Sequence, residues 1–390
     1  MVGRMGASLY SNQDDSTDTH SRTVTRLSLR MKVIDFAGKR TVFKFRGSAR
    51  RASGSDFSRN IPDSRVTVAK VEWKNTPNKM HVAIGRDYIG ELSGARVDGA
   101  NVKLNLTRHL GVGAFGGLLP DNISENSTSD TTYGGYAFYN ASSVGLTGGY
   151  VGIQNSSYGY LSGYLYPRRE ISLYGSTRVD QDENSGLYKI TNMLFSAGFR
   201  MGKIGRFGAS YNEYRAIKFQ DGTIGYDANY EVQKAARLTY EFDPFERLRI
   251  FGKMEGRTRT SDNSDAALFE FGMRLREIYK WYFAQVRYQD INHFDSKINR
   301  TVIEGGISKN AMEAGLALTI ATNEGKFSEN DFFQLIYGAW IDWNLTHKLF
   351  VSGRVEMSAE KYLDTDAIYN EKANSEFKST TIYLQAGYKF

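Results

Sequence analysis

The chain has 390 residues, a formal net charge of +7 and a pI near 9.2, and it is rich in glycine, tyrosine and phenylalanine. Because it contains no cysteine, disulfides, thiol catalysis, thiolate metal sites and covalent haem attachment are excluded within it. No stretch approaches the ~18 apolar residues that a membrane-spanning helix needs, although this test does not detect strands that alternate lipid-facing and lumen-facing residues.

Apolar and polar side chains alternate from the start of the chain with the period of two that is typical of β-strands. Two neighbouring segments, 24–33 and 43–50, put cations on one face and apolar side chains on the other. The cations are Arg26, Arg30 and Lys32 in the first segment and Lys44, Arg46 and Arg50 in the second. These two segments lack interleaved acidic residues.

The same alternation continues through the second half of the chain. Segments 248–257, 269–276 and 284–289 oppose apolar residues to Arg249, Lys253, Arg257, Arg274, Arg276 and Arg287. Here acidic residues are interleaved, so we expect Glu241, Glu255, Glu270 and Glu356 to pair with cations across strands. Segments 333–344, 349–358 and 381–390 complete the pattern.

Long and short connections alternate between these segments. The long ones are predicted at 11–21, 51–64, 87–95, 119–132, 180–186, 220–230, 260–265, 291–299, 321–330 and 360–378. The segments often span 10 to 13 residues, longer than the ~5–6 usual in soluble sheets, and aromatic residues gather near their ends. Counting gives about 22 strands, and a different division of the glycine-rich region 133–166 would give 18 or 20.

These features predict an all-β fold, a transmembrane antiparallel up-and-down β-barrel with short periplasmic turns and longer extracellular loops. A closed barrel satisfies every backbone hydrogen bond between strands, which an open sheet in lipid does not. We expect residues 1–390 to form one barrel domain without a plug or periplasmic domain. An even strand number places both termini on the periplasmic side.

The last segment, Tyr383-Leu-Gln-Ala-Gly-Tyr-Lys-Phe390, resembles the C-terminal strand of bacterial outer-membrane proteins. In that family this strand is the signal read by the barrel-assembly machinery, so the resemblance implies that Tyr388 and Phe390 act in biogenesis. The whole chain is broadly similar to porin-like proteins of Gram-negative bacteria, and no motif assigns it to a subfamily.

An arginine or lysine on the lipid face at mid-membrane costs ~2–4 kcal/mol, so we predict that the strand cations line the lumen, where they would favour anions. The predicted outer loops are acidic instead. Their acids are Asp14, Asp15, Asp18, Asp121, Glu125, Asp182, Glu183, Asp262, Asp265, Asp364, Asp366 and Glu371. These acidic residues are expected to serve solubility, with divalent-ion bridging to lipopolysaccharide as the alternative. Outer-membrane lipid and lipopolysaccharide are expected partners of the barrel, and nucleic acid is not.

No residue constellation points to catalysis. The five histidines, His20, His81, His109, His293 and His347, lack the spacing of a metal site. The glycine-rich stretch 111–117 is not followed by the Lys-Ser or Lys-Thr of a phosphate-binding loop. We therefore expect no enzyme activity, no cofactor and no metal.

Three functions remain open for a wide barrel without a plug. The first is a channel for passive, anion-preferring passage of hydrophilic solutes. The second is a sheath around a partner protein, resembling the barrels of porin–cytochrome conduits that hold a multihaem cytochrome; inward aromatic residues such as Phe251, Trp340 and Phe350 would then contact the guest. The third is a structural or adhesive surface protein.

Overall fold

A computed structural model of the chain describes residues 1–14, 20–54, 64–75, 79–120, 127–154, 156–181, 186–215, 232–260, 262, 264–294, 296–325, 331–362 and 376–390. Within these residues the chain forms one sheet of 22 strands. The strand count predicted from the alternation is therefore confirmed, and the glycine-rich region 133–166 contributes parts of three strands.

The strands follow one another along the chain with a single 3₁₀-helix, η1, between the fifth and sixth. They are β1 (Val2–Asp14), β2 (His20–Ile34), β3 (Thr41–Gly54), β4 (Ser64–Lys74), β5 (Met80–Ile89), η1 (Gly90–Leu92), β6 (Ala95–Asn105), β7 (Leu110–Pro120), β8 (Ser127–Asn140), β9 (Val144–Ile153), β10 (Ser156–Arg168), β11 (Ile171–Gln181), β12 (Tyr188–Met201), β13 (Gly205–Arg215), β14 (Val232–Phe245), β15 (Leu248–Arg259), β16 (Ser264–Ile278), β17 (Tyr282–Asn292), β18 (Ser296–Lys309), β19 (Met312–Gly325), β20 (Phe332–Trp343), β21 (Leu349–Tyr362) and β22 (Glu376–Lys389). No described helix is long and apolar enough to span a membrane, a finding that does not bear on strands.

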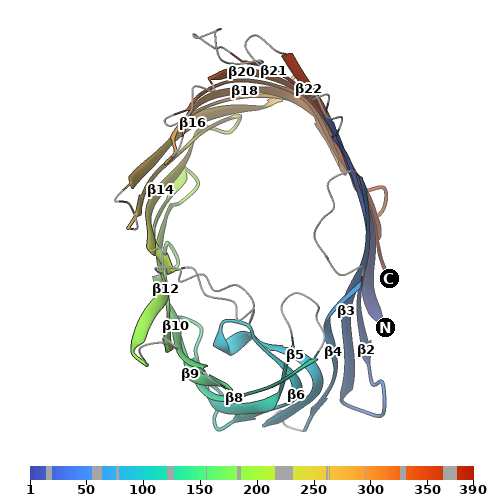
Figure 1. The fold of residues 1–390 in the computed structure, drawn as a ribbon, viewed down its shortest axis with the longest axis vertical. Helices are drawn as coiled ribbons and strands as arrows, with labels where there is room; N and C mark the ends of the chain where they lie inside the picture. The colour runs from blue at the N-terminus through green and yellow to red at the C-terminus, as the bar shows by residue number, and fades with distance from the viewer. Residues whose placement is uncertain are drawn as a thin grey trace.

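The sheet closes on itself. Each strand pairs antiparallel with the next, and β1 pairs antiparallel with β22, with Arg4 opposite Lys389 and Ala7 opposite Ala386. Backbone hydrogen bonds between Gly3 and Phe390, 2.8 and 3.0 Å, extend this closure to the last residue. Figure 1 shows the result as an elliptical ring with both termini on the same wall.

Short turns and longer connections alternate around the ring, as the sequence predicts, with two differences. Only residues 154 and 155 separate β9 from β10, so this connection is as short as the turns on the opposite end. The predicted loop at 87–95 is mostly ordered secondary structure, because β5 continues to Ile89, η1 follows, and β6 begins at Ala95.

The outer face of the barrel is apolar. Strand residues with large exposed hydrophobic side chains include Leu27, Ile84, Leu104, Leu146, Phe195, Leu238, Met254, Phe271, Ile303, Leu316, Tyr337 and Leu384. Where a strand carries cations, these residues alternate with them, so one face of the strand is apolar and the other is polar. On β7 and β9 the inward face carries Phe115 and Val151 of a buried apolar cluster instead. Such a surface is stable in hydrocarbon and would aggregate in water.

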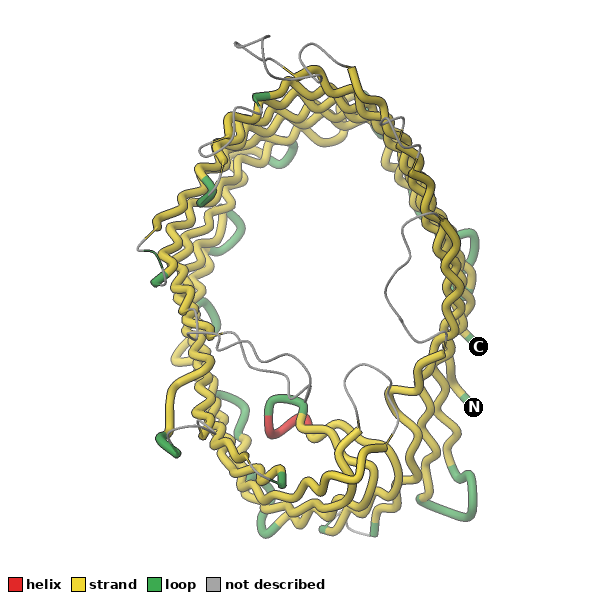
Figure 2. The backbone as a smooth tube through the Cα atoms, in the orientation of Figure 1, coloured by secondary structure: helices red, strands yellow, loops and turns green. Residues whose placement is uncertain are grey.

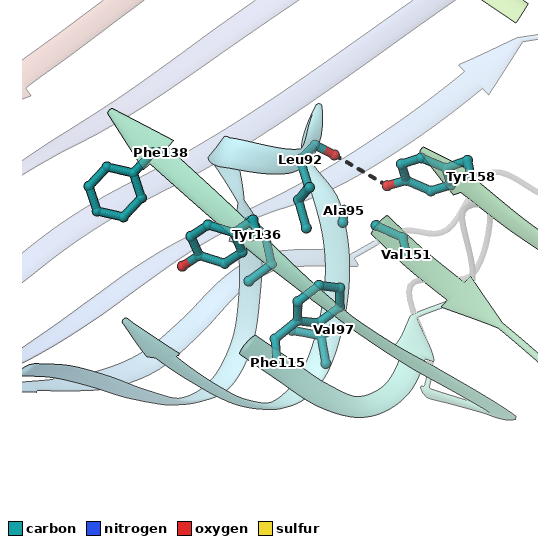
Figure 3. Close-up of a cluster of buried hydrophobic side chains, with 9 residues drawn as sticks. Leu92, Ala95, Val97, Phe115, Tyr136, Phe138, Val151 and Tyr158 are labelled. Carbon is teal, nitrogen blue, oxygen red and sulfur yellow. Dashed lines mark hydrogen bonds between the residues drawn. The ribbon is translucent and has the colours of Figure 1, made fainter. Parts of the chain in front are cut away.

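One segment of the wall folds into the ring. Figure 2 shows η1, the only described helix, inside the lumen beside β5 and β6. Leu92 of η1 is fully buried among Val97, Tyr136 and Val151, and Figure 3 shows the Tyr158 hydroxyl donating to the Leu92 carbonyl, at 3.2 Å. This cluster anchors an inward projection that narrows the lumen on one side.

Candidate functional site: the charged lumen wall

The contacts of η1 identify which strand face lines the lumen. Glu91 of η1 pairs with Lys103 of β6 at 2.7 Å, so the Lys103 face points inward. Residues directly opposite each other on neighbouring strands share a face. Lys103 is opposite His81, and His81 is opposite Lys74. On the same face of β4, Lys70 is opposite Lys44, which is opposite Lys32.

The lumen face of the strands on the other side of η1 is assigned in the same way, starting from Tyr158 of β10, which contacts η1. The register of each strand pair from β10 to β17 then shows which residues share the face of Tyr158. The structure thus places the side chains of all the cations predicted to line the pore on the lumen face. They are Arg26, Arg30, Lys32, Lys44, Arg46, Arg50, Arg249, Lys253, Arg257, Arg274, Arg276 and Arg287.

The cations of β1 to β3 stand directly opposite one another across the strands. Arg26 is opposite Arg50, Arg30 is opposite Arg46, and Lys32 is opposite Lys44. Barrel closure extends the Arg30–Arg46 pair onto two more strands, because Arg4 of β1 lies between Arg30 and Lys389 of β22. We call the set Arg4, Arg26, Arg30, Lys32, Arg46, Arg50 and Lys389 the cation ladder.

Within the described part of the chain, the cation ladder has no ion pair with a carboxylate. A ladder cation does contact a neutral group, since the Arg26 Nη2 atom donates to the Ser48 hydroxyl at 3.4 Å. Like charges directly opposite each other in a sheet repel and destabilise it. Such an arrangement persists in the lumen because water and mobile anions screen exposed side chains.

Lys44 has an acidic partner on the neighbouring strand, although its own segment contains no interleaved acidic residue. Its ammonium contacts the Glu72 carboxylate at 2.7 Å. Glu72 comes from β4 and also contacts Lys70 at 2.8 Å, and Lys70 contacts Asp87 at 2.5 Å. Lys44 therefore belongs to a network of paired charges and is not a member of the cation ladder, although Lys32 directly opposite it is.

Across the ring, seven cations of β13 to β17 have carboxylate partners, and Arg276, also predicted to line the pore, lies outside this set. Arg249 contacts Asp243 at 2.8 Å and Glu241 at 3.5 Å, and Arg274 contacts Glu313 at 2.9 Å. We call this set the paired cluster. Its members are Arg206, Arg237, Arg249, Lys253, Arg257, Arg274 and Arg287 with Glu241, Asp243, Glu255, Glu304 and Glu313.

Glu255 is the centre of the paired cluster. Its side chain is only 1% exposed and contacts Arg237 at 2.7 Å, Lys253 at 3.1 Å and Arg257. A buried carboxylate needs such partners, because desolvation of an unpaired charge is costly. The expected pairing of Glu241 is also present, with Arg206 at 3.2 Å, whereas Glu270 accepts a hydrogen bond from Gln289. Glu356 lies 4.0 Å from Arg354 on its own strand.

A cavity of about 400 Å³ opens in the wall beneath η1. Lys70, Lys103, Asp87 and Glu91 line it, and the Tyr136 hydroxyl donates to Asn101 there at 3.2 Å. Lys70 pairs with Asp87 and Lys103 pairs with Glu91, while Lys74 adds a third lysine to the lining. The cavity belongs to the inward projection.

Lumen aromatic side chains lie flat on the wall. A side-chain carbon added at Gly272 would meet the Phe251 ring at 2.4 Å, and one at Gly387 would meet the Phe350 ring at 2.0 Å. Phe350 also carries the Arg4 guanidinium 4.5 Å above its ring. Aromatic rings that cover glycines on a neighbouring strand are a known means of stabilising curved sheets. Phe251 and Phe350 are thus seated in the wall, and Trp340 packs likewise against Gly315.

Other sequence expectations fall partly outside the described residues. Of the acidic loop residues, Asp262 and Asp265 are described, and the Arg259 guanidinium beside Asp262 lowers the pKa of that carboxyl from its usual range. Side chains at the other acidic loop positions lie outside the described set. Tyr388 and Phe390 stack at the end of β22, with ring centroids 6.4 Å apart.

No group of three potential metal-ligating side chains occurs among the residues that the structure describes. His81 lies 3.5 Å from Glu72, and His109 contacts the Asn140 carbonyl at 2.8 Å. Arg4 and Lys389 were missed as site residues by sequence reasoning. Both alternate correctly with apolar neighbours, but only closure of β1 on β22 brings them together.

Comparisons with known proteins bear on the fold. No protein-family model matches the chain, and no curated protein sequence matches it. The solved structure of the copper transporter OprC is similar with a TM-score of 0.52 and 10% identity, over 100% of this chain and 80% of that one. The translocation pore of the P pilus usher PapC is similar with a TM-score of 0.51 and 8% identity, over 98% and 99%. By fold, the chain is a porin-like β-barrel of outer-membrane type, with 22 strands.

Proposed function

We propose that this protein is an outer-membrane channel that passes hydrophilic solutes passively and prefers anions. Its apolar outer face fits a lipid bilayer, and its lumen wall is lined by charged and polar side chains that fit water. With an even number of strands, the two termini and the short turns lie at the same end, which we assign to the periplasm.

The cation ladder is the observation that supports anion preference. A channel wall in which every charge is paired creates little field at the pore axis, whereas unpaired cations attract anions and repel cations. Seven cations of the paired cluster share five carboxylates, so most of their charge is offset, whereas no member of the ladder has a carboxylate partner among the described residues. The lumen therefore has a strongly basic side, on β22 and β1 to β3, and a side where most charges are paired.

Planar-bilayer recording under a KCl gradient tests this proposal. We expect steady unitary steps and a reversal potential displaced toward the chloride equilibrium potential. The double variant R30Q/R46Q should reduce the chloride-to-potassium permeability ratio on the order of twofold, because two cations without carboxylate partners are lost from the wall. High salt should weaken the preference of the native channel, because the ladder is exposed and is screened within ~3 Å at 1 M.

The matched control removes one ion pair of the paired cluster as a unit. R274Q/E313Q leaves the lumen charge unchanged, and we expect it to leave the reversal potential unchanged. A native channel that shows unitary steps but prefers potassium would contradict the anion preference. A folded protein that gives no steps at all would contradict the channel itself.

The last outcome would favour a barrel that sheathes a partner protein. The seating of Phe251 and Phe350 against wall glycines gives that function less support, because those rings already have contact surfaces within the barrel. A guest would have to be recognised mainly by the charged side chains of the lumen.

A further inference from the structure

Four arginines of the cation ladder surround two serines at one place on the lumen wall. Ser28 of β2 is directly opposite Ser48 of β3. The pair Arg26 and Arg50 lies on one side of these serines along the strands, and the pair Arg30 and Arg46 lies on the other. All six side chains share the lumen face, since they occupy alternate positions on two paired strands.

The serines form a low floor between the two arginine pairs. Gly6 of β1 is opposite Ser28 and adds no side chain, so the floor continues onto the neighbouring strand. The Ser28 hydroxyl contacts the Gly6 carbonyl at 3.2 Å and lies against the wall. Arg26 already leans over this floor, because its Nη2 atom contacts the Ser48 hydroxyl at 3.4 Å.

Charge balance around this floor is one-sided. None of the four arginines has a carboxylate partner within the described residues, and the Nε atom of Arg50 is buried without a hydrogen-bond partner. Arg4, opposite Arg30, adds a further cation at the edge. The paired cluster shows the contrast: Arg249 and Arg274 are also directly opposite each other, but each has its own carboxylate.

We propose that the four arginines and two serines, Arg26, Arg30, Arg46, Arg50, Ser28 and Ser48, form a binding site for a polyvalent oxyanion of the phosphate type. The site rests on the proposed channel function, for which it names the substrate class. Guanidinium groups donate paired hydrogen bonds that match phosphate oxygens. The Ser48 hydroxyl accepts from Arg26 and keeps its own proton to donate, whereas the Ser28 hydroxyl donates to the Gly6 carbonyl and serves as part of the low floor. A monovalent halide offers no such set of acceptors.

Binding also relieves the repulsion that the fold leaves in place. Arginines directly opposite each other are destabilising when no anion lies between them. A bound polyvalent anion neutralises both pairs at once, so the bound state gains more than the sum of two isolated contacts. The ligand is a solute of the lumen, because lipid headgroups lie on the outer side of the wall.

The first test measures binding without transport. Isothermal titration calorimetry of the purified, detergent-solubilised full chain with inorganic pyrophosphate should show saturable binding at constant ionic strength. R30Q/R46Q should weaken binding by roughly tenfold or more for each charge-assisted contact removed. S28A/S48A, which keeps all charges, should weaken it roughly threefold, the size of a neutral hydrogen bond.

The matched variant R249Q/R274Q lowers the lumen charge by the same two units while leaving the site intact. We expect it to bind pyrophosphate as the native protein does. Equal weakening in R249Q/R274Q and R30Q/R46Q would overturn the proposal, because binding would then reflect overall charge. Cooperative thermal transitions of the site variants, at or above the native temperature for R30Q/R46Q, show that they are folded.

The second test uses the channel. Pyrophosphate added to a KCl bath should reduce the chloride conductance saturably in the native protein and in R249Q/R274Q, and not in R30Q/R46Q. Calorimetric binding without any channel activity would retain the site and refute the channel. Normal anion-preferring conductance without saturable pyrophosphate binding would retain the channel and refute the site.

Discussion

The cation ladder and the paired cluster use the same residue types on the same face of one sheet, and they differ in what lies beside each cation. In the ladder, Arg30 meets Arg4 and Arg46 across the strands. In the cluster, Arg249 meets Arg274, but Asp243 and Glu313 neutralise both. The two regions therefore differ in the presence or absence of acidic partners rather than in the number of cations, and we propose that this absence along one wall makes the lumen basic.

The difference also separates structural from functional charge. The paired cluster contributes to wall stability, because a buried carboxylate such as Glu255 holds three cations from two strands. In the proposed channel the ladder supplies the field in the lumen, and its opposed like charges lower the stability of the wall. Variants that remove a carboxylate from the paired cluster, or add one to the cation ladder, test this distinction.

The largest effect is expected from E255Q. Losing the carboxylate leaves Arg237, Lys253 and Arg257 without their shared partner. We expect a loss of roughly 2–3 kcal/mol in the free energy of unfolding, less than the ~3–5 for a fully buried pair because the cations are partly exposed. Equilibrium unfolding in detergent with urea measures it. E241Q, at a more exposed carboxylate, is the control and should lose less.

The same variant should turn the cluster into a second set of unpaired cations. E255Q channels that do fold are expected to show stronger chloride preference than the native channel. An unchanged unfolding free energy in E255Q would show that the three contacts of Glu255 do not stabilise the barrel. The paired cluster would then not differ from the cation ladder in its contribution to stability.

An intermediate effect is expected from S28E, which gives the ladder the acidic partner it lacks. The new carboxylate would lie between Arg26 and Arg30 on β2, opposite Ser48. We expect unfolding to become more costly by about 1 kcal/mol, since cross-strand charge pairs contribute ~0.2–1 kcal/mol each. Anion preference should fall and pyrophosphate binding should be lost. S28Q is the uncharged control of similar size; equal effects of S28E and S28Q would assign them to volume.

The smallest effects are expected from single arginine neutralisations, and they should have opposite signs. R30Q removes a like-charge contact and should stabilise the barrel by about 0.5 kcal/mol, whereas R274Q breaks a pair and should destabilise it by about the same amount. Thermal unfolding at low and high salt measures both, and salt should reduce each difference. Stability changes of the same sign in R30Q and R274Q would contradict the distinction between the cation ladder and the paired cluster.

Much of this molecule follows from local sequence pattern. Period-two alternation predicts the strands, and the cost of a cation in lipid assigns Arg26, Arg249 and their counterparts to one face. The turns at 35–40 and 202–204 fall where the alternation breaks. Local pattern missed the ordered segment at 87–95, because burial of Leu92 against Tyr136 and Val151 depends on strands far along the chain.

The sequence by itself determined the fold class, the approximate number of strands and, where a strand carries cations, which face holds them, because these depend on residues two apart on one strand. Only the tertiary structure decided which charges are balanced. Lys44 finds Glu72 through the β3–β4 register, and Arg4 joins Lys389 through closure of β1 on β22. Ion pairing depends on cross-strand register and on ring closure, which are non-local, and the short-range pattern of a strand does not contain them.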